Sequence, residues 1–303
     1  MVPLKTQNIR AVAEKYRDRV TGRLGVGFTD LQTGESFTLL GDDEFPSAST
    51  FKVYILAELF RQAQEGRFKM SDRHALTEEV KSIGSGVLFN LGAGLNPTLQ
   101  DYATLMMIIS DNTATDFLFD LVGRDNIVKN VLQPLALSKT KCDLSCKALI
   151  ARYFEADDIE AIAAAEKAGK SFCGAPYYLC QTPENDSTSP NDMMKILRLV
   201  YERKLFTPWV CDEMLNIMLQ CQTNTRIPKF LPPGTEVAHK TGTMDRVAND
   251  VGIVYTPKGD YILTLFYNGN AASQEEYDRN VNGLLSDSLL AEISRDIYAE
   301  YVK

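Results

Sequence analysis

Strand patterns lie at both ends of this 303-residue chain, and helical patterns fill the long stretch between them. Near the start, two β-rich runs flank Gln32-Thr33-Gly34, which is typical of a hairpin turn. Three more runs come late, and Pro257-Lys258-Gly259-Asp260 separates the last two. Since strands need partners, this layout predicts one five-stranded antiparallel sheet built from both chain ends. The predicted strands are 24–31, 35–40, 235–241, 250–256 and 261–267.

Helical periodicity accounts for most of the remaining sequence. Two helix starts are marked clearly, by Thr98 with Asp101 and by Ser189-Pro190 with Asp192. We therefore predict an α+β fold of three layers (α/β/α), with a central all-helical subdomain beside the sheet. The predicted helices are 5–20, 49–65, 99–109, 113–122, 190–203, 207–222 and 286–301.

These elements predict a single domain, 1–303, with two lobes. The α/β lobe combines 1–45 with 230–303, and the helical lobe is 46–229. Residues 150–185 are first rich in alanine and acidic residues and then loop-like, and we interpret them as an insertion. A cleft between the lobes is the expected place for an active site.

The composition excludes several functional classes. Lys and Arg number 32 against 40 Asp and Glu, so the net charge is −8, and no basic run suits nucleic acid. Two histidines, His74 and His239, leave little room for multi-histidine metal centres or histidine-based catalysis. No apolar run is long enough to span a membrane, and no signal peptide is visible. We expect a cytoplasmic protein without a cofactor, or an exported one if the natural chain begins earlier.

Ser49-Thr50-Phe51-Lys52 opens the long helix predicted at 49–65. Positions i and i+3 share a helix face, so the Lys52 amine can reach the Ser49 hydroxyl. Serine becomes a good nucleophile only when a neighbour takes its proton, and a lysine can do so when burial or nearby positive charge lowers its pKa. An isolated match to this spacing is usually a surface helix, so the motif needs support from elsewhere.

Two further motifs supply that support. Ser110-Asp111-Asn112 lies between two predicted helices, where its plain interpretation is a junction of capping residues, with Asp111 as a structural hydrogen-bonding group. Lys240-Thr241-Gly242-Thr243 ends a predicted strand, where its plain interpretation is a polar strand edge. All three motifs together, in this order, form the set used by penicillin-recognising serine enzymes.

The sequence resembles class A β-lactamases and their relatives in the β-lactamase and penicillin-binding protein superfamily. The resemblance covers nearly the whole chain and includes Phe45-Pro46 before the first motif and His239 before the third. Asp186-Ser187-Thr188-Ser189-Pro190 resembles the stretch that closes the family's Ω-loop, and Arg226 lies 14 residues before Lys240. The resemblance implies a serine hydrolase acting on a β-lactam or another amide or ester that bears a carboxylate.

The resemblance also implies a role for each motif residue. Ser49 would be the acylated nucleophile, Lys52 its base or part of a proton relay, and Ser110 the donor of a proton to the leaving nitrogen. The backbone N–H groups of Ser49 and Thr243 would form the oxyanion hole. The substrate-binding residues would be Asn112, Lys240, Thr241, Gly242, Thr243 and Arg226.

One departure from the family bears on turnover. Class A enzymes carry an Ω-loop glutamate that serves as the deacylation base. Aligning Thr140–Asp143 with the family's loop entry places Cys146 at that position, and no glutamate lies between Val128 and Glu155. We expect an acyl-enzyme that hydrolyses penicillins slowly. Lys52, Glu155 or Glu184 could instead assist the hydrolytic water.

The cysteines cluster around this altered loop. Cys142, Cys146, Cys173 and Cys180 flank the insertion or lie in it, and free buried thiols are the plain interpretation. Disulfides that staple the loop, or a zinc site with four cysteine ligands, are the alternatives.

Three functional hypotheses remain open. The first is a slow β-lactamase-type hydrolase. The second is a penicillin-binding or DD-peptidase-like enzyme, favoured by the missing glutamate and opposed by the missing export signal. The third is a binder that does not hydrolyse β-lactams, which the intact set of Ser49, Lys52, Ser110 and Lys240 argues against. A glutaminase of similar architecture is a further, minor possibility, and the oligomeric state is left open.

Overall fold

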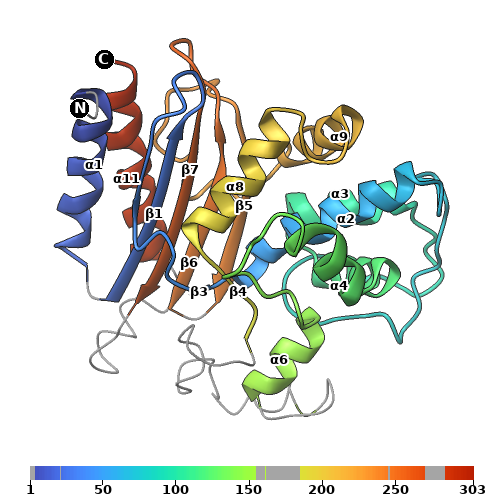
Figure 1. Ribbon diagram of the computed structural model, residues 1–303. Helices are drawn as coiled ribbons and strands as arrows, with labels where there is room; N and C mark the ends of the chain where they lie inside the picture. Colours follow the sequence, from blue (N-terminus) through green and yellow to red (C-terminus); the bar gives the residue numbers. More distant parts are fainter. Residues whose placement is uncertain (1–3, 21, 155–160, 162–184, 245, 270–283) are drawn as a thin grey trace.

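A five-stranded antiparallel sheet forms the centre of the α/β lobe in the computed structural model, which describes residues 4–20, 22–154, 161, 185–244, 246–269 and 284–303 (Figure 1). Its spatial order is β2-β1-β7-β6-β5, so the two N-terminal strands pair with the three C-terminal ones. Gly22 pairs with Gly269 and Asp30 with Tyr261, which joins the two chain ends along the whole of β1. The predicted sheet is confirmed. The strands are β1 (Gly22–Asp30), β2 (Ser36–Leu39), β5 (Val237–Met244), β6 (Val247–Val254) and β7 (Tyr261–Gly269).

Helices cover both faces of this sheet. The terminal helices α1 (Leu4–Arg17) and α11 (Leu284–Tyr301) lie side by side on one face, around a core that includes Ile9, Phe28 and Ile293. On the opposite face, α8 (Pro190–Tyr201) contacts β1, β6 and β7. Because both faces are covered, every residue of β6 is buried. The predicted three-layer α+β fold is therefore confirmed, while the division into lobes at 45/46 and 229/230 stays a prediction.

The helical subdomain surrounds α2 (Lys52–Gln64), whose residues from Lys52 to Phe60 are all buried. An all-buried helix needs partners on every side, and this one contacts α3, α4 and α9. The capping residues predicted from sequence are in place: Thr98 and Asp101 form a reciprocal capping box, and Ser189 caps α8. The other helices are α3 (Leu99–Ile108), α4 (Asn112–Val122), α5 (Arg124–Ile127), α6 (Cys146–Phe154), α9 (Pro208–Met218), the 3₁₀ helix η2 (Leu88–Asn90) and the π-helix η3 (Val128–Leu132).

Several local features differ from the sequence-based expectation. The head of the helix predicted at 49–65 is a separate 3₁₀ helix, η1 (Ala48–Phe51). Strand β5 continues through the third motif to Met244 because its ladder with β6 extends to Val247. Helix α6 was not predicted. Its first two N–H groups donate to Asp116, a residue of α4 that is distant in the sequence, so no capping residue next to the helix marks its start.

A short two-stranded sheet links distant segments near the first motif. β3 (Phe45–Pro46) pairs with β4 (Ser187–Thr188), and Lys141 forms an isolated bridge with Ser187. The chain just before η1 is thereby tied to the segment that resembles the end of the Ω-loop. This pairing holds the chain just before η1 against the residues just before α8.

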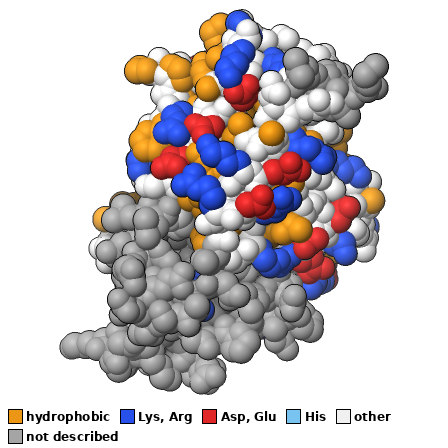
Figure 2. Space-filling view, turned by 90° about the vertical axis from the view of Figure 1, so that its left-hand side faces the viewer, with side chains coloured by type: hydrophobic (Ala, Val, Ile, Leu, Met, Phe, Trp, Pro, Cys, Tyr) orange, Lys and Arg blue, Asp and Glu red, His pale blue; other side chains and the backbone are white. Residues whose placement is uncertain are grey.

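The face that carries α1 and α11 shows basic and acidic side chains interspersed among apolar ones (Figure 2). Within the ranges that the structure describes, no helix is both long enough and apolar enough to cross a membrane.

Candidate active site

Ser49 lies in η1, at the entrance to the buried helix α2. In a 3₁₀ helix the side chains at i and i+3 eclipse one another, so Ser49 and Lys52 share a face. Ser49 is partly exposed, whereas Thr50, Phe51 and Lys52 are buried. The preceding residue, Ala48, has φ +43°, a left-handed conformation that costs an alanine energy and that the surrounding structure must hold in place. The serine is thus presented to solvent on a firmly fixed segment.

The Lys52 ammonium is fully buried and donates to three acceptors. These are the Ser110 carbonyl oxygen at 2.8 Å, Ser110 Oγ at 3.0 Å and Asn112 Oδ1 at 3.0 Å. Burial lowers the pKa of Lys52 below its ordinary value, and the nearby Asp116 and Asp111 carboxylates oppose this shift. A lysine in this setting can give up a proton and act as a base.

Ser110 joins the two buried lysines. Its φ is +60°, and in this left-handed conformation both its carbonyl and its hydroxyl oxygen accept from Lys52. The same hydroxyl oxygen accepts from Lys240 Nζ at 3.1 Å. A hydroxyl has two acceptor sites and one donor, so two incoming N–H bonds leave its proton free to point elsewhere. Ser110 is therefore arranged to donate a proton.

Lys240 reaches the site from β5. Its side chain is fully buried and also donates to the Thr241 carbonyl at 2.8 Å. Burial first, and then the charge of Lys52, lower its pKa to about 7. An incoming carboxylate would favour the charged form again, so this lysine is suited to bind an anion.

Asn112 and Asp111 organise the junction between α3 and α4. Asn112 accepts from Lys52 and donates to the Ile83 carbonyl at 3.0 Å. Asp111 caps α4 by accepting from Ala114 N and also accepts from Val87 N at 2.6 Å. Asp111 is thus a structural hydrogen-bonding group, as its sequence context indicated.

Arg226 lies behind the third motif and has an exposed fraction of 2%. Its guanidinium donates to Asp287 Oδ1, the Gly242 and Asn249 carbonyls, and Thr243 Oγ1, at 2.6–2.8 Å. The Thr243 hydroxyl lies at the exposed end of this chain of contacts. Arg226 therefore contacts the exposed Thr243 side chain, and its binding of a substrate carboxylate, directly or through Thr243, stays a prediction.

Asn249 and Gly242 determine how closely the sheet approaches η1. The motifs in the sequence did not identify Asn249. Asn249 is fully buried and donates to the Pro46 and Ser47 carbonyls at 2.8 and 3.1 Å. A Cβ atom at Gly242 would lie 2.8 Å from the Ser47 carbonyl oxygen. Because Gly242 has no side chain, β5 can approach the segment that carries Ser49. In the sequence, the only sign of a special role for Asn249 is that Asn249 and Asp250 form a polar pair within an otherwise apolar run.

We expect Gly242→Ala to lower stability by about 1–3 kcal/mol and to slow acylation, because the added methyl group must push β5 away from Ser47. Urea unfolding and acylation kinetics measure the two effects. Gly92→Ala is the matched control, since a Cβ atom there meets nothing within 4 Å. Equal effects of the two substitutions would contradict this account of Gly242.

Cys146 begins α6 close to Lys52. Its backbone N–H and that of Lys147 donate to the Asp116 carboxylate at 2.6 and 2.8 Å, and Ser82 Oγ donates to the same group. Burial raises the pKa of the Cys146 thiol, and the Lys52 charge opposes that shift. Asp116 is saturated by these donors, so it is poorly placed to activate water. Glu155 and Glu184, the other proposed bases, lie outside the described residues.

Asp186 is a buried carboxyl that sequence analysis treated only as part of the Ω-loop resemblance. Its Oδ1 accepts from Asp143 N at 2.7 Å and Leu144 N at 3.2 Å, while its backbone carbonyl accepts from Ser47 N. Oδ2 has no hydrogen-bond partner among the described residues. Burial raises the pKa of Asp186 from 3.8 to about 7, although the two backbone donors oppose the shift.

This shift predicts that stability falls as the pH rises. Between pH 4 and 7 the folded state holds a proton on Asp186 that the unfolded state has released, so the free energy of unfolding decreases across this window. The loss amounts to a few kcal/mol, at about 1.4 kcal/mol per pKa unit. Urea titrations from pH 4 to 8 should show a shallower decline for Asp186→Asn than for the wild type. Parallel curves would show that Asp186 does not titrate in this range.

The described cysteines are free and buried: Cys142, Cys146, Cys211 and Cys221. The interpretation as free buried thiols is therefore confirmed for Cys142 and Cys146, two of the four cysteines around the altered loop. Cys173 and Cys180 lie outside the described residues.

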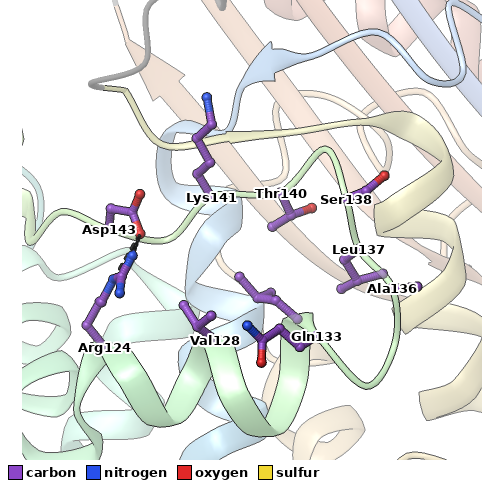
Figure 3. Close-up of a pocket in the computed structure, with 10 residues that line it drawn as sticks. Arg124, Val128, Gln133, Ala136, Leu137, Ser138, Thr140, Lys141 and Asp143 are labelled. Atoms are coloured by element: carbon purple, nitrogen blue, oxygen red, sulfur yellow. Dashed lines mark hydrogen bonds and ion pairs between the residues drawn. The ribbon is translucent and has the colours of Figure 1, made fainter.

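A separate cavity of about 280 Å³ lies beside the segment that leads to Cys146 (Figure 3). An Arg124–Asp143 ion pair of 2.7 Å lies at its edge. None of the predicted site residues lines it, so it is distinct from the serine site. Its lining residues are Arg124, Val128, Leu132, Gln133, Ala136, Leu137, Ser138, Thr140, Lys141 and Asp143.

The three motifs predicted from the sequence thus meet in one place: a partly exposed serine, two buried lysines and a serine that bridges them lie near one another. The chain belongs to the Beta-lactamase enzyme family, whose model matches residues 5–301.

Individual relatives agree with this assignment. Beta-lactamase PSE-4 of Pseudomonas aeruginosa is 28% identical over 142 residues, which cover 46% of this chain and 48%, about half, of that relative. Beta-lactamase VEB-1 of the same organism is 23% identical over 288 residues, covering 91% of this chain and 87% of the relative. The crystal structure of a beta-lactamase from Sphaerobacter thermophilus superposes with a TM-score of 0.76 at 25% identity, covering 98% of both chains.

Proposed function

We propose that the protein is acylated at Ser49 by β-lactams or by another amide or ester that bears a carboxylate. The observation that carries this proposal is the geometry at Ser110, whose hydroxyl oxygen accepts from both Lys52 and Lys240. One hydroxyl then links the base to the anion-binding lysine and keeps its own proton for the substrate. A structural role alone would not require two buried lysines around one serine, because burying amines that can carry like charges is costly.

The chemistry follows from this arrangement. Neutral Lys52 takes the Ser49 proton as Oγ attacks the carbonyl carbon, and the developing oxyanion is stabilised by the backbone N–H groups of Ser49 and Thr243. The C–N bond then breaks as Ser110 gives its proton to the leaving nitrogen, and Lys52 returns a proton to Ser110. Lys240, with Thr241 and Thr243, binds the substrate carboxylate, and Asn112 binds its side-chain amide.

We infer that hydrolysis of the acyl-enzyme is slow. The two carboxylates whose charges act on Lys52, those of Asp111 and Asp116, are occupied by backbone donors. The side chain at the position of the family's glutamate is Cys146, a buried thiol that burial keeps protonated. A water molecule next to the acyl group then lacks an efficient base.

Rapid mixing with nitrocefin or a labelled penicillin tests this function. We expect a burst of product equal to the enzyme concentration, followed by a much slower steady state. Fast and complete turnover without a burst would refute slow deacylation.

The same thiol at position 146 favours a second candidate, a penicillin-binding or DD-peptidase-like enzyme. Such an enzyme would release D-alanine from a peptide that ends in D-alanyl-D-alanine, whose terminal carboxylate suits Lys240. No release under conditions in which penicillin acylates the protein would exclude this candidate.

A further inference from the structure

A cavity of about 460 Å³ lies at the opposite end of α2 from the serine site. Its volume is in the usual range of small-molecule sites. At 1.5 Å per residue, Gln64 in its wall lies roughly 18 Å along the helix from Lys52. The serine chemistry uses none of the residues that line this cavity. The wall includes Arg61, Gln64 and Glu65 at the end of α2, Lys129 and Asn130 of η3, and Phe206 in the turn before α9.

Phe206 brings an exposed aromatic ring to this wall in a strained conformation. Its φ is +59°, a left-handed conformation that is rare for a bulky residue, and 37% of the residue is exposed. Trp209, three residues later, is 42% exposed and packs edge-on against Phe60 of α2, with ring centroids 5.7 Å apart. Strained residues of this kind cluster at functional sites. The ring of Phe206 is therefore available for stacking against a ligand in the cavity.

The charges of the wall balance one another. Arg61 donates to Glu58 Oε1 and Oε2, each at 2.7 Å, and also to Glu65. Lys129 is exposed and forms no ion pair with any residue that the structure describes. Two basic side chains thus face two acidic ones, so the wall does not favour a strongly charged ligand.

Two amide side chains offer hydrogen bonds of both kinds. Asn130 Nδ2 donates to Glu58 Oε1 at 3.1 Å, which leaves the Asn130 carbonyl oxygen to accept. Gln64 Oε1 accepts from the Thr207 hydroxyl, which leaves the Gln64 amide nitrogen to donate. Asn130 also belongs to a π-helix, a geometry that is frequent at functional sites. A ligand that suits this wall has neighbouring groups that donate and accept, together with an apolar face for Phe206.

We propose that this cavity is a binding site for a saccharide. A sugar hydroxyl can both donate and accept, which matches Gln64 and Asn130, and the C–H face of a sugar ring can pack on the exposed Phe206 ring. A neutral sugar also agrees with the balanced charges of the wall. A purely apolar ligand would leave both amides without partners, which is unfavourable. Because the cavity is distant from Ser49, it can hold a saccharide whether or not the serine is acylated.

Trp209 is the only tryptophan in the chain, so its fluorescence reports on this region directly. We expect titration with cellobiose, maltose or N,N′-diacetylchitobiose to change its emission for at least one of the three, with a Kd in the millimolar range or below. Isothermal titration calorimetry measures the same binding without depending on the fluorophore. Ser49→Ala should bind the saccharide as tightly as the wild type.

Two variants of the wall test the assigned contacts. Phe206→Ala removes the stacking ring, and Gln64→Leu keeps a side chain of similar size without the amide. Each should weaken binding at least about tenfold. Phe230→Ala is the matched control, because it removes another exposed phenylalanine, and its affinity should equal that of the wild type. Circular dichroism checks that each variant is folded, and Gln64→Leu decides the question if Phe206→Ala is not.

No heat and no change in emission with any of the three saccharides would overturn the proposal. Wild-type affinity in a folded Phe206→Ala or Gln64→Leu protein would also overturn it. Loss of binding in Ser49→Ala would place the saccharide in the serine site instead of in this cavity.

Discussion

Replacing Lys52 with methionine is expected to slow acylation of Ser49 by about 10²–10⁴-fold, the range that a positioned general base contributes. Methionine keeps a long, unbranched side chain at this buried position but removes the amine that takes the serine proton. It also removes the three hydrogen bonds to Ser110 and Asn112, so Ser110 loses one of its two lysine partners. Stopped-flow acylation with a fluorescent penicillin measures the change.

The variant Lys240→Met tests whether Lys52 and Lys240 have different roles, base and anion-binding group. It keeps Lys52 and the Ser49 nucleophile, so we expect weaker binding of carboxylate-bearing substrates and a smaller loss in the maximal acylation rate. Thermal unfolding of both variants checks that the fold is intact. An acylation rate in a folded Lys52→Met protein within a few-fold of the wild type would show that Lys52 is not the base.

Replacing Cys146 with glutamate is expected to accelerate deacylation by about 10²–10⁴-fold. Residue 146 begins α6 beside Lys52, and Asp116 fixes its backbone, so a carboxylate there would lie at the edge of the serine site with a lysine partner. It could then accept a proton from water during attack on the acyl group. Single-turnover measurement of the acyl-enzyme lifetime reports this step alone.

Cys146→Gln is the matched control, because it has the size of glutamate without a basic group. We expect it to leave the acyl-enzyme lifetime nearly unchanged, while the glutamate variant shortens it. If both variants shortened the lifetime equally, the gain would come from loosening of the loop rather than from a new base. If neither did, position 146 would not control deacylation.

Local signals in the sequence predicted the elements of the fold well. The alternating strands, the Thr98 capping box and the Ser189 cap all depend on neighbouring residues, and the structure confirms them. The three motifs likewise placed Lys52, Ser110 and Lys240 in one site, and the structure shows Ser110 Oγ accepting from both lysines.

Features that depend on distant contacts were not predictable in this way. The cap of α6 by Asp116 joins residues 30 positions apart, and the bond from Asn249 to Ser47 spans about 200 positions. The burial of Arg226 behind Thr243 likewise depends on Asp287, which the chain brings in from the last helix. No local periodicity encodes such contacts, so their roles emerge only once the elements are assembled.

Intact-mass spectrometry after brief exposure to benzylpenicillin tests the central claim most directly. The wild-type chain should gain the mass of one penicillin, with the adduct mapped to the peptide that contains Ser49. Ser49→Ala should fold normally and gain no mass. An adduct of the same size on the Ser49→Ala protein, or none on the wild type, would contradict a serine acyl-enzyme at this site.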